Sequence, residues 1–324
     1  MLKRYYSVQK ILYLLIAVTG VPVNLMAIVI LSRGKCGLST CTTRYLVAMA
    51  AADLLTIVTE VILSRINWYY FPWNFLDITP VCSVIDSLTY AATDCSVWFT
   101  VTFTFDRFVA ICCQKLKTKY CTGKNAAVVL TTTGVLSCLK NIPRYFTFEH
   151  NVIIDNVPWF CRIKENYFTD PGWVGYDWLD TVLTPLLPFA GILLLNALTV
   201  RHILVASRVR KGLKGQSKGE NRSDPEMESR RRSVVLLFTL SGNFIFLWMT
   251  YVANVIYYQV AGKGSDFSES EWIFHYVGVL LRNFSCCTNT FIYAVTQSKF
   301  REQLIGAVKY PVTSVLQFMN KAAP

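Results

Sequence analysis

The chain has 324 residues, of which 53% are hydrophobic and only 16% are charged, and its mean hydropathy is +0.37. Soluble domains carry about 25% charged residues, so this composition excludes an ordinary soluble domain. The formal net charge is +12. Because the basic residues follow alternate connections between apolar segments, they indicate membrane topology, and we expect no nucleic-acid partner.

Seven long apolar segments follow one another along the chain. Most reach the roughly 20 residues that a membrane-spanning helix needs, and none shows the two-residue alternation of an outer-membrane barrel strand. The segments are 11–31, 45–63, 84–111, 126–146, 178–204, 234–260 and 272–295. The fourth and seventh are the most polar. We therefore predict an all-α membrane protein, a seven-transmembrane helix bundle.

Lys and Arg gather in the connections after segments one, three and five, and after segment seven. By the positive-inside rule these connections and the C-terminus are cytoplasmic, and the N-terminus is extracellular. The predicted divisions are an extracellular tail at 1–10, the transmembrane domain at 11–296 with a cytoplasmic loop at 205–233, and an amphipathic helix with a cytoplasmic tail at 297–324.

Apolar residues recur at helical spacing after the seventh segment, at Phe300, Leu304 and Val308. This pattern predicts a short amphipathic eighth helix lying along the inner membrane surface. The excess of positive charge is also attracted to the anionic lipid of the cytoplasmic leaflet. We therefore expect a multi-pass plasma membrane protein whose immediate partner is the lipid bilayer.

Two of the eleven cysteines, Cys82 and Cys161, fall in the predicted extracellular regions. An oxidising exterior favours a disulfide between them, which would tie the long connection at 146–178 to the third segment. Arg107 follows Cys82 by about 37 Å of helix, slightly more than the bilayer core. One helix can therefore relate an event on one side of the membrane to an event on the other.

A polar group is predicted in the middle of the membrane. Asp53 is mid-helix and cannot reach the interface, and Asn24, Ser96 and Asn289 lie at depths that could converge with it. Such a carboxylate with hydroxyls and amides could hold a sodium ion or a water cluster, or it could form a packed polar group without an ion. We expect no other cofactor or metal.

A second polar set lies toward the extracellular half. Its members are Glu60, Asp86, Tyr90, Asp180, Trp248, Tyr251, Arg282 and Asn283. Acids, one deep arginine and aromatics at similar depth suggest a pocket for a small zwitterion with an aromatic part. The alternative is that Arg282 pairs with Glu60 or Asp86 only to hold helices together. Three further cations, Arg65, Lys140 and Arg144, lie near helix ends and are interpreted as snorkelling or pairing.

Arg107 lies at the predicted inner mouth beside Asp106, with Tyr293 and the basic start of the sixth segment, including Arg230, near it. One interpretation is an interfacial arginine in contact with lipid phosphates. The other is a switch, in which Asp106 holds Arg107 until the helices part.

Seven landmarks occur in a fixed order. They are Asn24 in GVPVN, Asp53 in AAADLL, Cys82 with Cys161, Asp106-Arg107-Phe108, Pro188 in LLPF, Phe244-x-x-x-Trp248, and Asn289-x-x-x-Tyr293 followed by Phe300. With them the chain resembles a rhodopsin-like (class A) G-protein-coupled receptor over essentially its whole length. The stretches LSRGKCGLSTC, SVWFTVTFTFDRFVAICCQKLKTKYCT, LLLNALTVRHIL and DPEMESRRRS resemble the orphan pair called G-protein coupled receptors 139 and 142.

The resemblance implies a cell-surface receptor that binds a small extracellular ligand and activates a heterotrimeric G protein. For the orphan pair it implies an aromatic amino acid such as tryptophan or phenylalanine, and the G protein Gq. A small peptide is the alternative ligand. Some positions depart from the family pattern. Thr250 and Thr290 replace prolines, Asn196 replaces a helix-five tyrosine, and Arg230 stands at the acidic position of the inner lock.

Other classes fit less well. A retinal protein needs an intramembrane lysine, and the seventh segment has none. A secondary transporter or channel for a small zwitterion is the main alternative, but neither repeats nor broken helices are evident. No nucleophile-base set, Walker loop or metal spacing indicates an enzyme.

Overall fold

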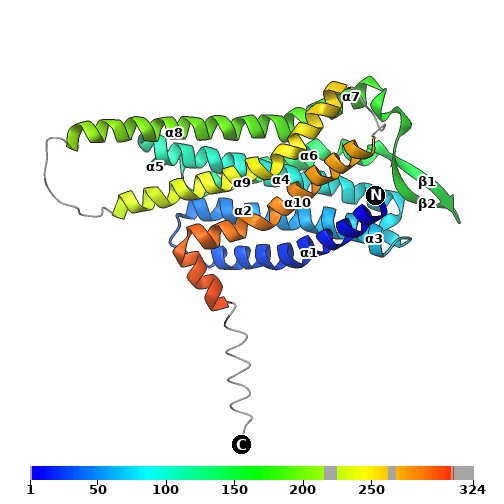
Figure 1. The fold of residues 1–324 in the computed structure, drawn as a ribbon, viewed down its shortest axis with the longest axis horizontal. Coiled ribbons are helices and arrows are strands. Elements are labelled where there is room, and N and C mark those ends of the chain that lie inside the picture. Colours follow the sequence, from blue (N-terminus) through cyan, green and yellow to red (C-terminus); the bar gives the residue numbers. More distant parts are fainter. Residues whose placement is uncertain (1, 215–224, 262–267, 308, 310–324) are drawn as a thin grey trace, which may run out of the picture.

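The computed structural model describes residues 2–214, 225–261, 268–307 and 309 of the chain. The side chains of residues 2–5, 209–214 and 225–230 lie outside this description. Within the described residues, seven long helical segments run side by side along the longest axis of the molecule (Figure 1).

The seven segments are built from eleven helical elements. In chain order they are α1 (Leu2–Ser32); α2 (Thr40–Thr56), η1 (Ile57–Ile66) and α3 (Asn67–Tyr70); α4 (Thr79–Cys112); α6 (Gly123–Asn141); α7 (Pro171–Thr181), η5 (Val182–Leu186) and α8 (Leu187–Lys214); α9 (Pro225–Ala261); and α10 (Glu269–Thr296). Shorter helices connect them: η2 (Phe75–Asp77), α5 (Gln114–Tyr120), η3 (Pro143–Thr147) and η4 (Glu165–Phe168).

Six of these segments are long and apolar enough to cross a membrane by length and composition. The seventh, α10, is long enough but carries polar residues such as His275, Arg282 and Asn289 that lower its hydropathy. The predicted seven-helix bundle is confirmed, and the polar seventh segment predicted from the sequence is α10.

The helices extend beyond the apolar segments. α1 begins at Leu2, so residues 2–10, expected as a tail, are helical. Helices also continue into the expected loop at 205–233, since α8 runs to Lys214 and α9 begins at Pro225, while residues 215–224 between them lie outside the described residues. The physical reason is that a helix satisfies its own backbone in water as well as in lipid, so it need not end where apolar side chains end.

Two membrane helices contain π-helical turns. η1 continues the second membrane helix after α2 and contains Glu60 and Arg65. In η5, Thr184 has non-helical angles (φ −153°, ψ 94°) one residue before Pro185, whose ring cannot donate a backbone hydrogen bond. π turns are frequent at functional sites.

The connection after η3 forms a two-stranded antiparallel sheet that was not predicted from the sequence. β1 (Phe148–Ile154) pairs with β2 (Val157–Ile163), with His150 opposite Cys161. Asp155 and Asn156 form the turn with positive φ of 51° and 60°, as a two-residue hairpin requires. It is the one sheet among the described residues.

The predicted disulfide between Cys82 and Cys161 is confirmed, with a Cα–Cα distance of 6.2 Å. It joins the middle of β2 to the first turn of α4. The Thr79 hydroxyl donates a hydrogen bond to the Phe160 carbonyl at 3.0 Å beside it. The hairpin is therefore fixed over one end of the bundle.

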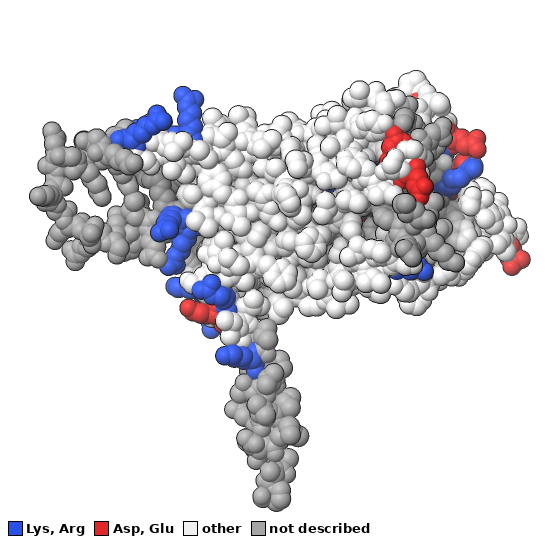
Figure 2. Space-filling view, in the orientation of Figure 1, with Lys and Arg blue, Asp and Glu red and all other residues white. Residues whose placement is uncertain are grey.

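Charged side chains gather at the two ends of the molecule on the face shown in Figure 2, and the band between them is almost free of charge. We call these the hairpin end, next to β1 and β2, and the basic end, where α8 ends and α9 begins (Figure 1). In the band, Val18, Phe246 and Val295 are each 70% or more exposed. Such exposure fits contact with lipid.

Residues 298–307 form the predicted eighth helix, which leaves α10 at an angle (Figure 1). Phe300 is fully buried and packs edge-on against Tyr293, with ring centroids 5.8 Å apart. Leu304 is half-buried, and Val308 lies outside the described residues. The eighth helix is therefore anchored to the end of the seventh.

Candidate functional site

A chamber of about 110 Å³ lies inside the bundle toward the hairpin end. Its lining residues come from η1, α4, α9 and α10. They are Glu60, Ser64, Arg65, Asp86, Thr89, Tyr90, Thr93, Tyr251, His275, Val279 and Arg282. Five of the eight predicted ligand-binding residues are therefore brought together: Glu60, Asp86, Tyr90, Tyr251 and Arg282.

Arginines exceed acids on one wall of this chamber. Arg282 forms a short ion pair with Glu60, and Arg65 Nη2 lies 3.7 Å from the other Glu60 oxygen. The Arg282 guanidinium also lies 4.8 Å from the centre of the Tyr251 ring. The Nε atoms of Arg65 and Arg282 are buried without a hydrogen-bond partner among the described residues. One carboxylate thus serves two guanidiniums, and the wall retains donors for an anion.

Asp86 and Tyr90, on the α4 side of the chamber, contact an arginine that does not itself line it. Arg144 Nε donates to Asp86 Oδ2 at 3.1 Å, and its guanidinium lies 3.5 Å from the centre of the Tyr90 ring. Arg144 is buried, so it pairs inside the bundle and does not snorkel to the interface. Asp86 is therefore already neutralised, and it offers little to a ligand cation.

Asp180, a predicted ligand residue, does not line the chamber. Lys140 Nζ lies 2.6 Å from Asp180 Oδ1 and 2.7 Å from Asp94 Oδ2. Asn141 Nδ2 also donates to Asp94 at 2.6 Å. Lys140 is thus a cation between one buried and one half-buried carboxylate, and this group joins α4, α6 and α7.

Trp248 and Asn283 lie deeper than the chamber and do not line it. Trp248 stacks on Phe244 at 5.0 Å and meets Tyr251 edge-on at 5.7 Å. Its Nε1 donates to Ser285 Oγ at 3.2 Å. Asn283 is fully buried, and neither polar atom of its amide has a partner among the described residues. A ligand in the chamber would reach Trp248 only through Tyr251.

A larger vestibule of about 720 Å³ lies between this chamber and the hairpin. It shares Ser64, Arg65 and Asp86 with the chamber, so the two are continuous. Aromatic side chains form much of its wall: Tyr6, Trp68, Tyr69, Phe148, Phe160 and Tyr276. These residues were not predicted as site residues, although the sequence placed a run of aromatics at Trp68–Trp73 next to the second helix.

The polar residues expected at mid-membrane converge in part. Both oxygens of the buried Asp53 carboxylate accept hydrogen bonds, from Ser96 Oγ at 2.5 Å and from Asn289 Nδ2 at 2.8 Å. Asn24 donates instead to the carbonyls of Gly20 and Cys286. No group of three His, Cys, Asp or Glu side chains in the described part of the chain could hold a metal ion.

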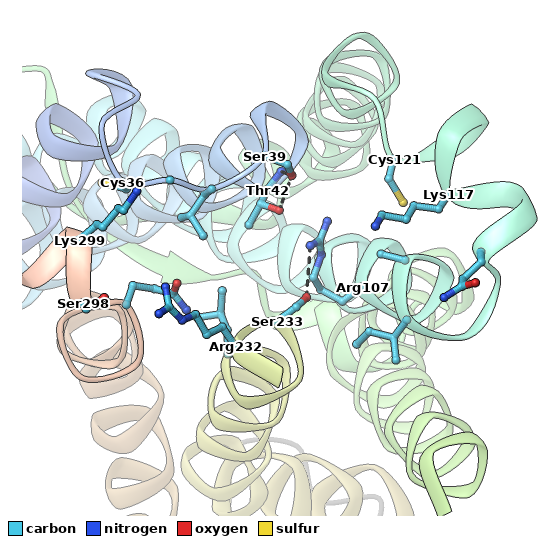
Figure 3. A pocket seen from close by; sticks show the side chains of 17 residues that line it. Cys36, Ser39, Thr42, Arg107, Lys117, Cys121, Arg232, Ser233, Ser298 and Lys299 are labelled. Atoms are coloured by element: carbon cyan, nitrogen blue, oxygen red, sulfur yellow. Dashed lines mark hydrogen bonds between the residues drawn. The ribbon is translucent and has the colours of Figure 1, made fainter. Parts of the chain in front are cut away.

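Arg107 is held at the basic end of α4. Its Nε donates to Asp106 Oδ2 at 3.0 Å, and its Nη1 donates to Ser233 Oγ of α9 at 3.4 Å, the dashed line in Figure 3. Cys41 donates its thiol to the other Asp106 oxygen at 3.1 Å. Both Asp106 oxygens therefore accept hydrogen bonds, and Ser233 connects Arg107 to α9.

Three other predicted switch residues are Tyr293, Asn196 and Arg230. Tyr293 is fully buried, and its hydroxyl has no partner among the described residues. Asn196 is half-buried, and its Oδ1 is likewise without a partner there. The side chain of Arg230 lies outside the described residues, so its predicted place in the inner lock stays a prediction.

A cavity of about 370 Å³ opens beside Arg107 at the basic end. Four cationic side chains from four elements line it: Arg107 of α4, Lys117 of α5, Arg232 of α9 and Lys299 of the eighth helix (Figure 3). Among its described lining residues there is no carboxylate. The cavity is therefore suited to an anionic partner segment.

Comparison with known proteins identifies the family. The profile described as "7 transmembrane receptor (rhodopsin family)" matches residues 23–293. The thyrotropin-releasing hormone receptor of Gallus gallus is 24% identical over 315 residues, 92% of this chain and 77% of that protein. The growth hormone secretagogue receptor type 1 of Homo sapiens is 24% identical over 292 residues, 88% of this chain and 76% of that protein.

The FMRFamide receptor of Drosophila melanogaster is 24% identical over 314 residues, which are 91% of this chain and 53% of that protein. These relatives are receptors and not enzymes, in agreement with the sequence. The family profile extends from the first membrane helix to Tyr293 of the seventh, and so includes residues of all seven. The chain belongs to the rhodopsin family of seven-transmembrane receptors.

Proposed function

We propose that this receptor lies in the plasma membrane, binds a small extracellular peptide or aromatic amino acid at the hairpin end, and activates a heterotrimeric G protein at the basic end. The observation that carries the proposal is the pair of cavities at opposite ends of the same helices. α4 and α9 contribute residues to both the chamber and the basic cavity. A shift of these helices would change both.

The orientation follows from charge. Lys and Arg side chains gather at the basic end on the face shown in Figure 2, and acidic side chains gather at the hairpin end. The positive-inside rule makes the basic end cytoplasmic. A disulfide at the hairpin end agrees with an oxidising exterior. The N-terminus is then extracellular and the C-terminus cytoplasmic.

Size and charge support a ligand with an anionic group. The vestibule, at about 720 Å³, is within the roughly 300–1,000 Å³ of small-molecule sites, whereas the chamber, at about 110 Å³, accepts only a small group. Glu60 pairs with two guanidiniums, those of Arg65 and Arg282, whereas Asp86 pairs with Arg144, which does not line the chamber; this group of five side chains has one net positive charge. A carboxylate fits the chamber, and an aromatic ring or peptide chain fits the aromatic vestibule.

The relatives support a peptide, since one is named for FMRFamide and another for thyrotropin-releasing hormone. The resemblance to the orphan pair supports an aromatic amino acid and the G protein Gq. In the basic cavity, Arg107 released from Asp106 would meet an anionic segment of the G protein. We also infer that a sodium ion can occupy the group around Asp53, where a carboxylate, a hydroxyl and an amide converge.

The test is Arg282→Gln in cells, with intracellular calcium release in response to L-tryptophan, L-phenylalanine and a panel of short peptides. The parent should respond to one of them, and the variant should lose that response at equal surface expression. Lys164→Gln is the matched control, because Lys164 is a cation at the hairpin end that lines neither cavity. An unchanged dose-response in the Arg282 variant would contradict the role of the chamber.

A further inference from the structure

α9 bends toward its hairpin end, as Figure 1 shows, although no proline follows Pro225 in this helix. Thr250 stands at a position where the family pattern has a proline. Helix bends usually arise at proline, at Gly/Ser pairs, at π turns or at an inserted group. In α9 the candidate of this kind is the pair Ser241–Gly242, which has open space around it: a Cβ added to Gly242 would meet nothing within 4 Å.

The backbones of α9 and α10 touch at a different glycine. A Cβ added to Gly278 of α10 would lie 3.1 Å from Tyr251 Cα, 3.2 Å from Tyr251 N and 3.4 Å from the Thr250 carbonyl carbon. All three are backbone atoms, so no side-chain rotation could relieve this contact. Gly278 therefore allows the α10 backbone to contact the α9 backbone at Thr250 and Tyr251, where the family pattern has a bend-inducing proline.

Hydrogen bonds join α9 to α10 on both sides of this contact. The pairs are Asn254 with His275 (2.8 Å) toward the hairpin end, and Trp248 with Ser285 (3.2 Å) and Asn243 with Thr288 (2.8 Å) toward the basic end. α9 is assigned as α-helix throughout residues 225–261, so its own ladder is not interrupted. Contacts with α10 hold the bend, and a bend held in this way can straighten when they open.

We propose that α9, the sixth membrane helix, pivots about its contact with Gly278 of α10. Gly278 is a positioning residue that holds α9 bent while Arg107 is paired with Asp106. The proposal rests on the proposed function, because it concerns how the helices shift between two states. Eighteen residues separate Ser233 from Tyr251, about 27 Å of helix at 1.5 Å per residue, so a tilt of roughly 10° at the pivot moves Ser233 by about 5 Å. That displacement breaks the hydrogen bond between Ser233 and Arg107.

The decisive variant is Gly278→Ala. Its methyl group forces the two backbones apart by a few tenths of an ångström and so disfavours the bent arrangement. The purified chain in lipid nanodiscs, mixed with Gq heterotrimer and no ligand, is assayed for uptake of labelled GTPγS. The variant should raise this basal rate about fivefold, which corresponds to about 1 kcal/mol at 1.4 kcal/mol per tenfold.

Gly242→Ala is the matched control, since it makes the same substitution in α9 where the methyl meets open space. It should leave the basal rate unchanged. A basal rate that rises with Gly242→Ala, or that does not change with Gly278→Ala, overturns the proposal, because the bend would then arise at the Gly/Ser pair or be unrelated to signalling.

Hydrogen–deuterium exchange of the same proteins keeps the test independent of folding failure and of the G protein. Gly278→Ala should speed amide exchange in residues 248–258 of α9 and leave α4 protected. Exchange that rises throughout the bundle or stays at the parental rate in α9 contradicts a local pivot. If the parent drives no nucleotide exchange on Gq, the proposed coupling fails, while amide exchange still decides whether Gly278 holds the bend.

Discussion

Lys140 allows a direct test of how burial changes the contribution of an ion pair to the free energy of unfolding. Its ammonium lies 2.6 Å from Asp180 and 2.7 Å from Asp94, and its side chain is only 14% exposed. Lys140→Met keeps most of the apolar stem but leaves the buried Asp94 and the half-buried Asp180 facing each other without a cation. Removing one partner of a buried pair costs about 3–5 kcal/mol.

That cost sets the size of the expected shift. At about 2–4 °C per kcal/mol for a chain of this size, the unfolding midpoint should fall by roughly 6–20 °C. The midpoint is measured on protein in nanodiscs with a thiol-reactive dye, which reports exposure of the buried Cys286 and Cys287. Adding Asp94→Asn and Asp180→Asn to Lys140→Met should recover most of the loss, because no unpaired charge then remains.

Arg162 provides the matched control. It also lies between two carboxylates, Glu149 at 2.7 Å and Glu165 at 3.3 Å, but its side chain is 51% exposed. Solvent screens such a pair, so Arg162→Met should change the midpoint little. Equal losses in the Lys140 and Arg162 variants would refute the argument from burial.

Three further predictions concern single groups. Cys82→Ser should lower the unfolding midpoint in nanodiscs, since the disulfide to Cys161 spans 79 residues and a closed loop of that length stabilises by about 4 kcal/mol; a midpoint that matches the dithiothreitol-treated parent would support this. Tyr293→Phe should not lower the midpoint, because its buried hydroxyl has no partner among the described residues; a loss of stability would reveal a hidden partner. Burial, with the Asp106 carboxylate as a second cause, raises the pKa of Cys121 to about 12, so maleimide labelling of Cys121 should stay slow at pH 8 and accelerate only toward pH 11; fast labelling at pH 8 would contradict the burial.

Depth in the membrane was predictable from the sequence, because each helical residue advances the chain by a fixed 1.5 Å. Counting from the helix ends placed Asp53 at mid-membrane and Glu60 with Arg282 at one level, and the structure pairs Asp53 with Asn289 and Glu60 with Arg282. The number of helices followed from the lengths of the apolar segments in the same way.

Rotation about each helix was not predictable. One extra residue in a π turn rotates all later side chains by about 100°. η5 lies between Asp180 and α8, so counting back from α8 along a regular helix gives Asp180 the wrong rotation; Asp180 meets Lys140 of α6 and does not line the chamber. Trp248 was placed at the right depth, but Tyr251 lies between it and the chamber.

The hairpin was missed although its turn carried a local signal. Asp155-Asn156 stands between two apolar runs, a composition that favours a two-residue turn. The vestibule residues were missed because a cavity between the helices and the hairpin exists only once β2 is fixed against α4.

The four cations of the basic cavity have a consequence for the speed of the encounter with the cytoplasmic partner. Arg107, Lys117, Arg232 and Lys299 act together as a concentrated field at a concave surface. Such a field draws in an oppositely charged protein before the two surfaces meet, and its range shrinks to about 10 Å at 0.1 M salt. Ionic strength should then change the association rate constant of the two proteins, while the lifetime of the complex depends on the close contacts around Arg107.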